Sequence, residues 1–170
     1  VTNSMYGVLY NYCAAADIYN SNLSEISNGS NTTATAYPQA VPQEGHRGIC
    51  PEGWHISSVA EFNALKAEAS KSGDLCIGDW NTSSASGSPG DANYANRNRL
   101  GFSAFATGMY GNGRGCSTQY LGEYSLFWTT VKVDNNNDSH QMVGVGPYNA
   151  TGYYQQRLYN HVKVAVRCVR

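Results

Sequence analysis

Apolar side chains recur at helical spacing in one stretch of the chain, residues 57–71. Ser58 with Glu61 three positions later fits a capping box, in which each side chain accepts a hydrogen bond from the other residue's free backbone N–H. The pattern therefore predicts a helix over 57–71 that Gly73 ends. Its buried stripe would consist of Val59, Phe62, Leu65 and Ala69.

Elsewhere apolar residues occupy every second position, which is typical of strands with one buried face. The clearest example is the C-terminal segment, where Val162, Val164, Val166 and Cys168 would share a face. The pattern predicts strands at 6–12, 101–110, 124–131, 140–146, 153–159 and 162–169.

Two long segments show neither pattern. Residues 17–45 contain no Lys or Arg and are rich in Asn, Ser and Thr, which indicates an irregular connection closed by Pro38 and Pro42. Residues 73–100 are too long for a plain connector, so we expect either a mobile segment or a packed functional loop.

Composition agrees with this outline. The chain has 170 residues, which suits a single domain over 1–170 with a substantial core. Gly (18) and Tyr (13) are frequent, which favours turns and strands over helices. A helix with several short strands and long irregular loops indicates an α+β protein.

Charge and the length of the apolar stretches exclude two classes of function. Lys and Arg (11) nearly balance Asp and Glu (12), and there is no basic run of the kind that binds nucleic acid. No apolar stretch is long enough to span a membrane as a helix. We therefore expect no nucleic-acid partner and no membrane insertion.

Residues 46–55 are the first candidate for chemistry. His46, Cys50 and His55 could bind zinc together with a nearby carboxylate, or Cys50 and His55 could form a nucleophile and its base. The spacing matches no strong zinc template, and nothing nearby supplies an orienting group or an oxyanion site. We instead predict a structural role, with Trp54 in the core, Cys50 in a disulfide and His55 in a local hydrogen bond. No catalytic or metal-binding residue is predicted.

Asp134–Asp138 places oxygen-bearing side chains as the first half of a calcium loop does. The glycine expected at the sixth position is Ser139, and the acid expected at the twelfth is Val145, so an EF-hand is excluded. A looser calcium site and a solvated turn stay open as interpretations, and no other cofactor is expected.

The strongest candidate for recognition is the segment 134–161. Alternation along 153–159 would send Tyr153, Gln155, Arg157 and Tyr159 to one face, which suits contact with a ligand better than packing in a core. An exposed polar sheet face without a ligand is the alternative. The candidate ligand-binding residues are Asn136, Asp138, His140, Tyr148, Asn149, Tyr153, Gln155, Arg157, Tyr159, Asn160 and His161.

Five separated motifs resemble the Fibrobacter succinogenes major paralogous domain family. They are "YGVLYNYCAAA", "ICPEGWHISSVAEF", "GFSAFATGMY", "FWTT" and "VAVRCVR", and they span residues 6–170 in the family's order. Tyr12 and Ser57 depart from the Trp and Pro usual at these positions. The resemblance implies a C-type lectin-like fold, with small twisted antiparallel sheets, one or two helices and long loops, in secreted or surface proteins of Bacteroidota.

Five cysteines spread over the chain indicate an oxidising compartment. None of them forms a CxxC pair, which weakens zinc-ribbon and thioredoxin-type interpretations. The resemblance implies a disulfide between Cys50 and Cys168. We expect a second one between Cys76 and Cys116, which leaves Cys13 free.

The resemblance also points to a function. One branch of this fold family serves as the variable protein of diversity-generating retroelements, with a diversified segment near the C-terminus. We therefore expect a recognition module that binds a protein or glycan on a cell surface and that is secreted or displayed on a bacterial envelope or phage particle. The signatures of calcium-dependent sugar-binding lectins are absent. A structural pilus or surface-layer subunit is the alternative, followed by an enzyme of the formylglycine-generating type.

Overall fold

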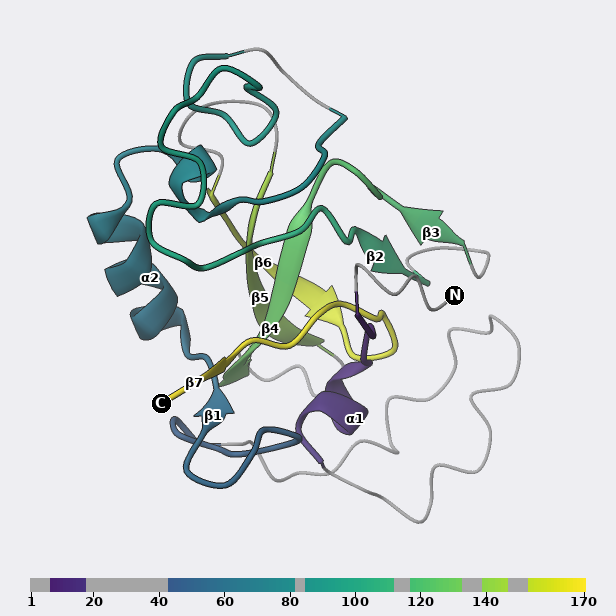
Figure 1. The fold of residues 1–170 in the computed structure, drawn as a ribbon. Coiled ribbons are helices and arrows are strands. Elements are labelled where there is room, and N and C mark those ends of the chain that lie inside the picture. The colour runs from purple at the N-terminus through teal and green to yellow at the C-terminus, as the bar shows by residue number, and fades with distance from the viewer. Residues whose placement is uncertain (1–6, 18–42, 82–84, 112–116, 133–138, 147–152) are drawn as a thin grey trace.

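Small antiparallel sheets and two α-helices make up the protein, in the computed structural model that describes residues 7–17, 43–81, 85–111, 117–132, 139–146 and 153–170 (Figure 1). The fold is α+β, as the sequence predicts. In chain order the elements are α1 (Tyr12–Ala15), β1 (His55–Ile56), α2 (Val59–Glu68), a 3-10 turn (Ser72–Leu75), β2 (Met109–Tyr110), β3 (Thr118–Gln119), β4 (Ser125–Lys132), β5 (Ser139–Val145), β6 (Tyr153–Tyr159) and β7 (Cys168–Val169).

The largest sheet has the strand order β4-β5-β6 and is antiparallel throughout. Its three long strands coincide with the predicted strands at 124–131, 140–146 and 153–159. Two-stranded pairs, β1-β7 and β2-β3, complete the described sheets. In Figure 1 the long strands cross the centre of the molecule, and β1 and β7 lie beside each other near the C-terminus.

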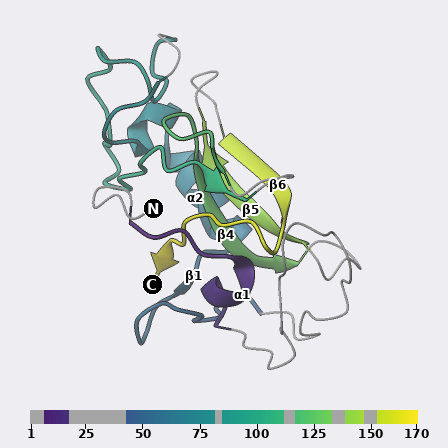
Figure 2. The same ribbon diagram turned by 90° about the vertical axis from the view of Figure 1, so that its right-hand side faces the viewer.

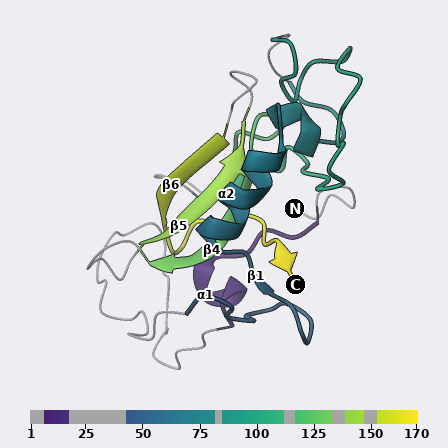
Figure 3. The same ribbon diagram turned by 90° about the vertical axis from the view of Figure 1, so that its left-hand side faces the viewer.

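The central sheet separates two hydrophobic clusters, because successive side chains on a strand point to opposite faces. On one face, Trp128 and Met142 pack with Tyr12 of α1 and with the C-terminal segment. On the other, Phe127 and Val143 pack with Phe62 of α2. Figure 3 shows α2 lying across this second face.

The capping box predicted for α2 is present. The Ser58 hydroxyl accepts a hydrogen bond from the Glu61 backbone N–H at 3.2 Å, and the Glu61 carboxylate accepts one from the Ser58 N–H at 2.8 Å. The helix ends at Glu68, before the predicted residue 71. It ends early because the Asp74 carboxylate accepts the backbone N–H of Ser70 at 2.8 Å, which draws the chain out of the helix. The predicted stripe packs into the second cluster: Val59, Phe62, Leu65 and Ala69.

The strand predicted at 6–12 is wrong. Tyr10 forms an isolated bridge to Val164, and the chain then turns into α1. The side chain of Asn11 accepts a hydrogen bond from the Ala14 N–H at 2.8 Å and so caps that helix. A local cap therefore overrides the alternation of apolar residues.

The strands predicted at 101–110 and 162–169 are shorter than expected. Strand geometry is confined to Met109–Tyr110 and Cys168–Val169, although the C-terminal segment also bridges three separate partners. Its backbone pairs in turn with Tyr110, Tyr10 and Phe127. The predicted inward face is nevertheless correct, since all four of its residues belong to the first cluster: Val162, Val164, Val166 and Cys168.

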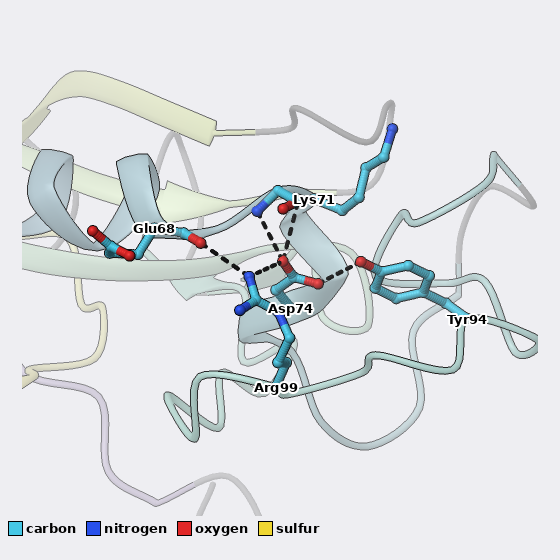
Figure 4. Close-up of polar contacts among 6 residues, drawn as sticks. Glu68, Lys71, Asp74, Tyr94 and Arg99 are labelled. Atoms are coloured by element: carbon cyan, nitrogen blue, oxygen red, sulfur yellow. Dashed lines mark hydrogen bonds and ion pairs between the residues drawn. The ribbon is translucent and has the colours of Figure 1, made fainter.

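The described part of the loop 73–100 is packed around one carboxylate, that of Asp74 (Figure 4). The Tyr94 hydroxyl donates a hydrogen bond to Asp74 Oδ1, and Arg99 Nη2 lies 3.0 Å from Asp74 Oδ2. Burial would raise the pKa of this carboxyl, but the hydrogen bonds from Tyr94, Arg99 and two backbone N–H groups together hold it below its usual range. Of the two expectations for this loop, packing is the one observed.

Candidate functional site

The register of β6 against β5 confirms the alternation predicted for 153–159. Tyr153 pairs with Val145, and Arg157 pairs with Gln141. Directly paired residues lie on the same face of a sheet. The predicted set Tyr153, Gln155, Arg157 and Tyr159 therefore shares one face with alternate residues of β5.

This face changes character along the strand. Tyr153 is partly buried, and its ring packs edge-on against Phe62 with centroids 6.4 Å apart. Burial raises the pKa of the Tyr153 phenol to about 12. Further along, Gln155 and Arg157 are exposed, and Tyr159 has 46% of its surface accessible. Tyr153 is therefore a packing residue, whereas the rest of the strand face is open to contact.

Two side-chain contacts organise the open part. Gln155 Nε2 donates a hydrogen bond to Gln141 Oε1 at 3.3 Å. The rings of Tyr159 and His161 are stacked, with centroids 5.7 Å apart and planes at 16°. We call this surface the β6 face and define it as Gln141, Gln155, Arg157, Tyr159 and His161.

Arg157 carries the charge of the β6 face. Within the described residues it forms no ion pair, and the described parts of β5 and β6 contain no Asp or Glu. A guanidinium presents several N–H donors in a fixed plane, which suits carboxylate, phosphate or carbonyl groups. The β6 face is thus positively charged, aromatic and rich in hydrogen-bonding groups.

Two predicted ligand-binding residues are instead in the interior. His140 stacks on Tyr12 with ring centroids 3.4 Å apart, and its Nδ1 lies 2.7 Å from Asn160 Oδ1. Both His140 and Asn160 are buried. His140 pairs with Leu158, so it belongs to the face opposite Arg157 and points into the first cluster. These two side chains are therefore enclosed rather than exposed, and each contacts the other's polar group inside the protein.

Four further candidates lie outside the described residues: Asn136, Asp138, Tyr148 and Asn149. The calcium interpretation of Asp134–Asp138 also concerns residues that the structure does not describe.

The segment 46–55 is structural in most respects. Cys50 forms the expected disulfide with Cys168, which joins β7 to the chain before β1, with Cα atoms 5.7 Å apart. His55 Nε2 lies 2.8 Å from Glu61 Oε1, the local hydrogen bond that was predicted. Trp54 is not in the core, since it is 41% exposed in a tight turn, and Ile56 fills the interior instead.

The second predicted disulfide does not form. Cys76 is a free thiol enclosed in the second cluster, and its Sγ donates to the Ser72 carbonyl oxygen at 3.3 Å. Its expected partner, Cys116, lies outside the described residues. Burial raises the pKa of the Cys76 thiol, so the thiolate form is suppressed. Cys13 is also free, as expected.

A small cavity of about 170 Å³ under α2 was not anticipated from the sequence. At its wall, the Arg167 guanidinium lies 4.4 Å from the centroid of the Phe102 ring and 5.6 Å from that of Phe127. Burial lowers the pKa of Arg167, and contact with the two ring faces offsets part of the cost of desolvation. The pocket is mostly hydrocarbon, which suits packing rather than catalysis.

Among the residues that the structure describes, no group of three or more His, Cys, Asp or Glu side chains is placed to hold a metal ion. No helix in the same described ranges has the length and apolar character needed to cross a membrane.

These features define a small disulfide-bonded α+β protein in which the β6 face is exposed, polar and aromatic. The sequence profile of the Fibrobacter succinogenes major domain matches residues 1–170, so the chain belongs to that family. Searches of curated proteins and of solved structures found no match.

Proposed function

We propose that this domain is a recognition module that binds a protein or glycan through the β6 face. One observation supports the proposal above the others. Gln155, Arg157 and Tyr159 are exposed side by side on a strand whose pairing with β5 is continuous from end to end. Tyr and Arg are the residue types most enriched among the energetic centres of interfaces.

The scaffold holds this surface in place before any ligand arrives. β5 pairs with β6 at each of its residues, and Val143 and Val145 of β5 are fully buried under α2. A preorganised surface loses less conformational entropy on binding than a mobile loop does. This rigidity favours recognition over a surface that is polar for solubility alone.

We further propose a C-type lectin-like scaffold, secreted or displayed on a bacterial envelope or phage particle. Family membership and the Cys50–Cys168 disulfide support this proposal, because disulfides persist in oxidising compartments. A role as the variable protein of a diversity-generating retroelement belongs to the same proposal. A template repeat and a reverse-transcriptase gene beside this gene would support that role, and their absence would contradict it.

The proposed function is not catalytic. Cys50, the nucleophile considered together with His55, is bonded to Cys168. His55 is already engaged with Glu61. The pair therefore contributes to folding rather than to a reaction.

The test begins with glycan and protein arrays screened with and without calcium. The ligand found is then measured against a double variant, Arg157→Ala with Tyr159→Ala. We expect binding to weaken by about a hundredfold, because two central contact residues together contribute about 3 kcal/mol. Asn63→Ala on the exposed side of α2 is the matched control and leaves binding unchanged.

Three outcomes oppose the proposal. Full binding by the double variant places the ligand elsewhere. Loss of binding together with a lowered melting temperature indicates a structural face, and so does the absence of any ligand in the screen. Both of these last two outcomes favour a structural pilus or surface-layer subunit.

A further inference from the structure

The outer edge of β6 is the feature that the recognition proposal leaves unused. Within the described residues β6 has β5 on one side and no strand on the other. The opposite edge of the same sheet is covered by backbone hydrogen bonds. The backbone N–H of Trp128 in β4 donates to the Ala165 carbonyl at 3.1 Å, and the backbone N–H of Ala165 donates to the Leu126 carbonyl at 3.1 Å. Among the described residues the sheet is therefore closed at β4 and open at β6, and Figures 2 and 3 show β6 on its outer side.

Apart from the charge of Arg157, this edge lacks the sequence features that usually prevent strands from associating. Exposed edges are commonly protected by proline, by charged side chains (lysine above all), by a bulge or by shortness. β6 runs for seven residues without a proline or a lysine. Its pairs with β5 follow one another without a register shift, from Tyr153 to Tyr159. Such an edge is a template for another strand.

The sequence of β6, Tyr-Tyr-Gln-Gln-Arg-Leu-Tyr, is close to a palindrome in chemical type. An antiparallel pairing of two copies centred on Gln156 places Tyr153 opposite Tyr159 and Gln155 opposite Arg157. Aromatic pairs and amide–guanidinium pairs are both favourable across neighbouring strands. Gln156 then lies opposite its own copy.

Other registers are less favourable. Cross-strand neighbours must share a face, so the centre of a two-fold antiparallel pair lies on a residue. A centre on Arg157 would oppose two guanidinium groups directly. A centre on Gln155 would leave Leu158 and Tyr159 without partners in β6. With the centre on Gln156, all seven residues pair and the two Arg157 positions are about 7 Å apart along the strand direction.

We propose that two copies of this chain associate through β6, forming a continuous six-stranded antiparallel sheet. About six to eight backbone hydrogen bonds join the two strands, depending on which set of N–H groups points outward. The two-fold axis is perpendicular to the sheet, so both β6 faces lie on the same side. The dimer therefore presents two adjacent recognition surfaces in one plane. The proposal concerns the backbone edge and does not rest on the proposed ligand.

A charge exchange at Gln156 tests this inference. Gln156 is exposed, and its side chain projects to the face opposite Gln155 and Arg157. Gln156→Glu and Gln156→Lys each oppose two like charges at the axis. We expect wild-type protein to sediment reversibly as a dimer, and each variant to dimerise about tenfold more weakly. An equimolar mixture of the two variants restores the dimer. The same substitutions at Asn63, exposed on α2, serve as the control and leave dimerisation unchanged.

Three results would overturn the inference: a wild-type chain that stays monomeric at every concentration, single variants that dimerise as wild type does, and a mixture that shows no rescue. Hydrogen exchange on the wild type provides a measurement that needs no variant. The β6 amides become more protected as protein concentration rises if the edge is the interface, and protection independent of concentration would contradict it. Failure of the ligand screen leaves these outcomes unaffected.

Discussion

Asp74 Oδ2 lies 3.0 Å from Arg99 Nη2, and this contact joins the 3-10 turn after α2 to the end of the loop that follows. The Asp74 side chain is fully buried, whereas that of Arg99 is partly exposed. Since the same carboxylate also accepts the Tyr94 hydroxyl and backbone N–H groups, its charge is satisfied from several directions.

Asp74→Asn is expected to destabilise the protein by about 3 kcal/mol, because it leaves donors in the interior without a charged acceptor. Urea denaturation measures the change in the free energy of unfolding. Asp79→Asn, at an exposed position in the same loop, is the control and should change stability by less than about 0.5 kcal/mol. Equal effects of the two substitutions would contradict the assigned role.

The pH dependence of stability follows from the same carboxyl. Its pKa is lower in the folded protein than in the unfolded chain, where it is near 3.9, so its contribution is fully present above that value. The contribution is lost as pH falls through the lower, folded pKa. We expect the stability difference between wild type and Asp74→Asn to shrink below about pH 4. A difference that is constant down to pH 2 would be inconsistent with this linkage.

The Cys50–Cys168 disulfide closes a segment with a sequence separation of 118 residues. In the chain-entropy account, a loop of this length stabilises the protein by about 4–5 kcal/mol. The double variant Cys50→Ser with Cys168→Ser should therefore melt well below wild type, as calorimetry can measure. Cys13→Ser, which removes a free thiol, is the control. A double variant as stable as wild type would refute the estimate.

Tyr153 and Tyr94 should respond oppositely to loss of their hydroxyl groups. The Tyr153 hydroxyl is buried without a hydrogen-bond partner among the described residues, whereas that of Tyr94 donates to Asp74. Tyr153→Phe is expected to be neutral or stabilising by up to about 1 kcal/mol, and Tyr94→Phe destabilising by about 1 kcal/mol. Paired urea titrations compare the two variants. Destabilisation by Tyr153→Phe would indicate a partner for its hydroxyl.

Alkaline titration provides an independent check on Tyr153. Its folded pKa is about 12, above the unfolded value near 10, so the stability linked to its protonated form is complete below about pH 10. That stability is lost as pH rises towards 12. The effect should be missing in Tyr153→Phe, and an unchanged alkaline profile in this variant would count against the assignment.

Local signals accounted for α2 and for the long strands. Ser58 and Glu61 act within one turn of chain, and the alternation along 153–159 depends on strand geometry alone, so both are visible in sequence. The disulfide of Cys50 with Cys168 was reached by family resemblance, because spacing does not reveal which cysteines meet.

The errors have a common physical origin. His140 and Asn160 look like surface residues because they are polar, yet each satisfies the other in the interior beside Tyr12. Trp54 looks like a core residue because it is aromatic, yet it sits in an exposed turn. Residue type gives an average tendency to be buried, whereas burial depends on partners brought together from distant parts of the chain.

The sequence by itself determined the class of fold, the capped helix, the family and the strand that carries the candidate surface. Each depends on neighbours in sequence or on motifs in order. The tertiary structure alone decided which polar residues of that region are available to a ligand, because α2 covers Tyr153 at one end of β6 and leaves Arg157 and Tyr159 exposed. It also decided that, in the part of the chain that the structure describes, β4 is covered while β6 is open. Pairing at a sheet edge depends on residues such as Trp128 and Ala165, which are far apart in the chain.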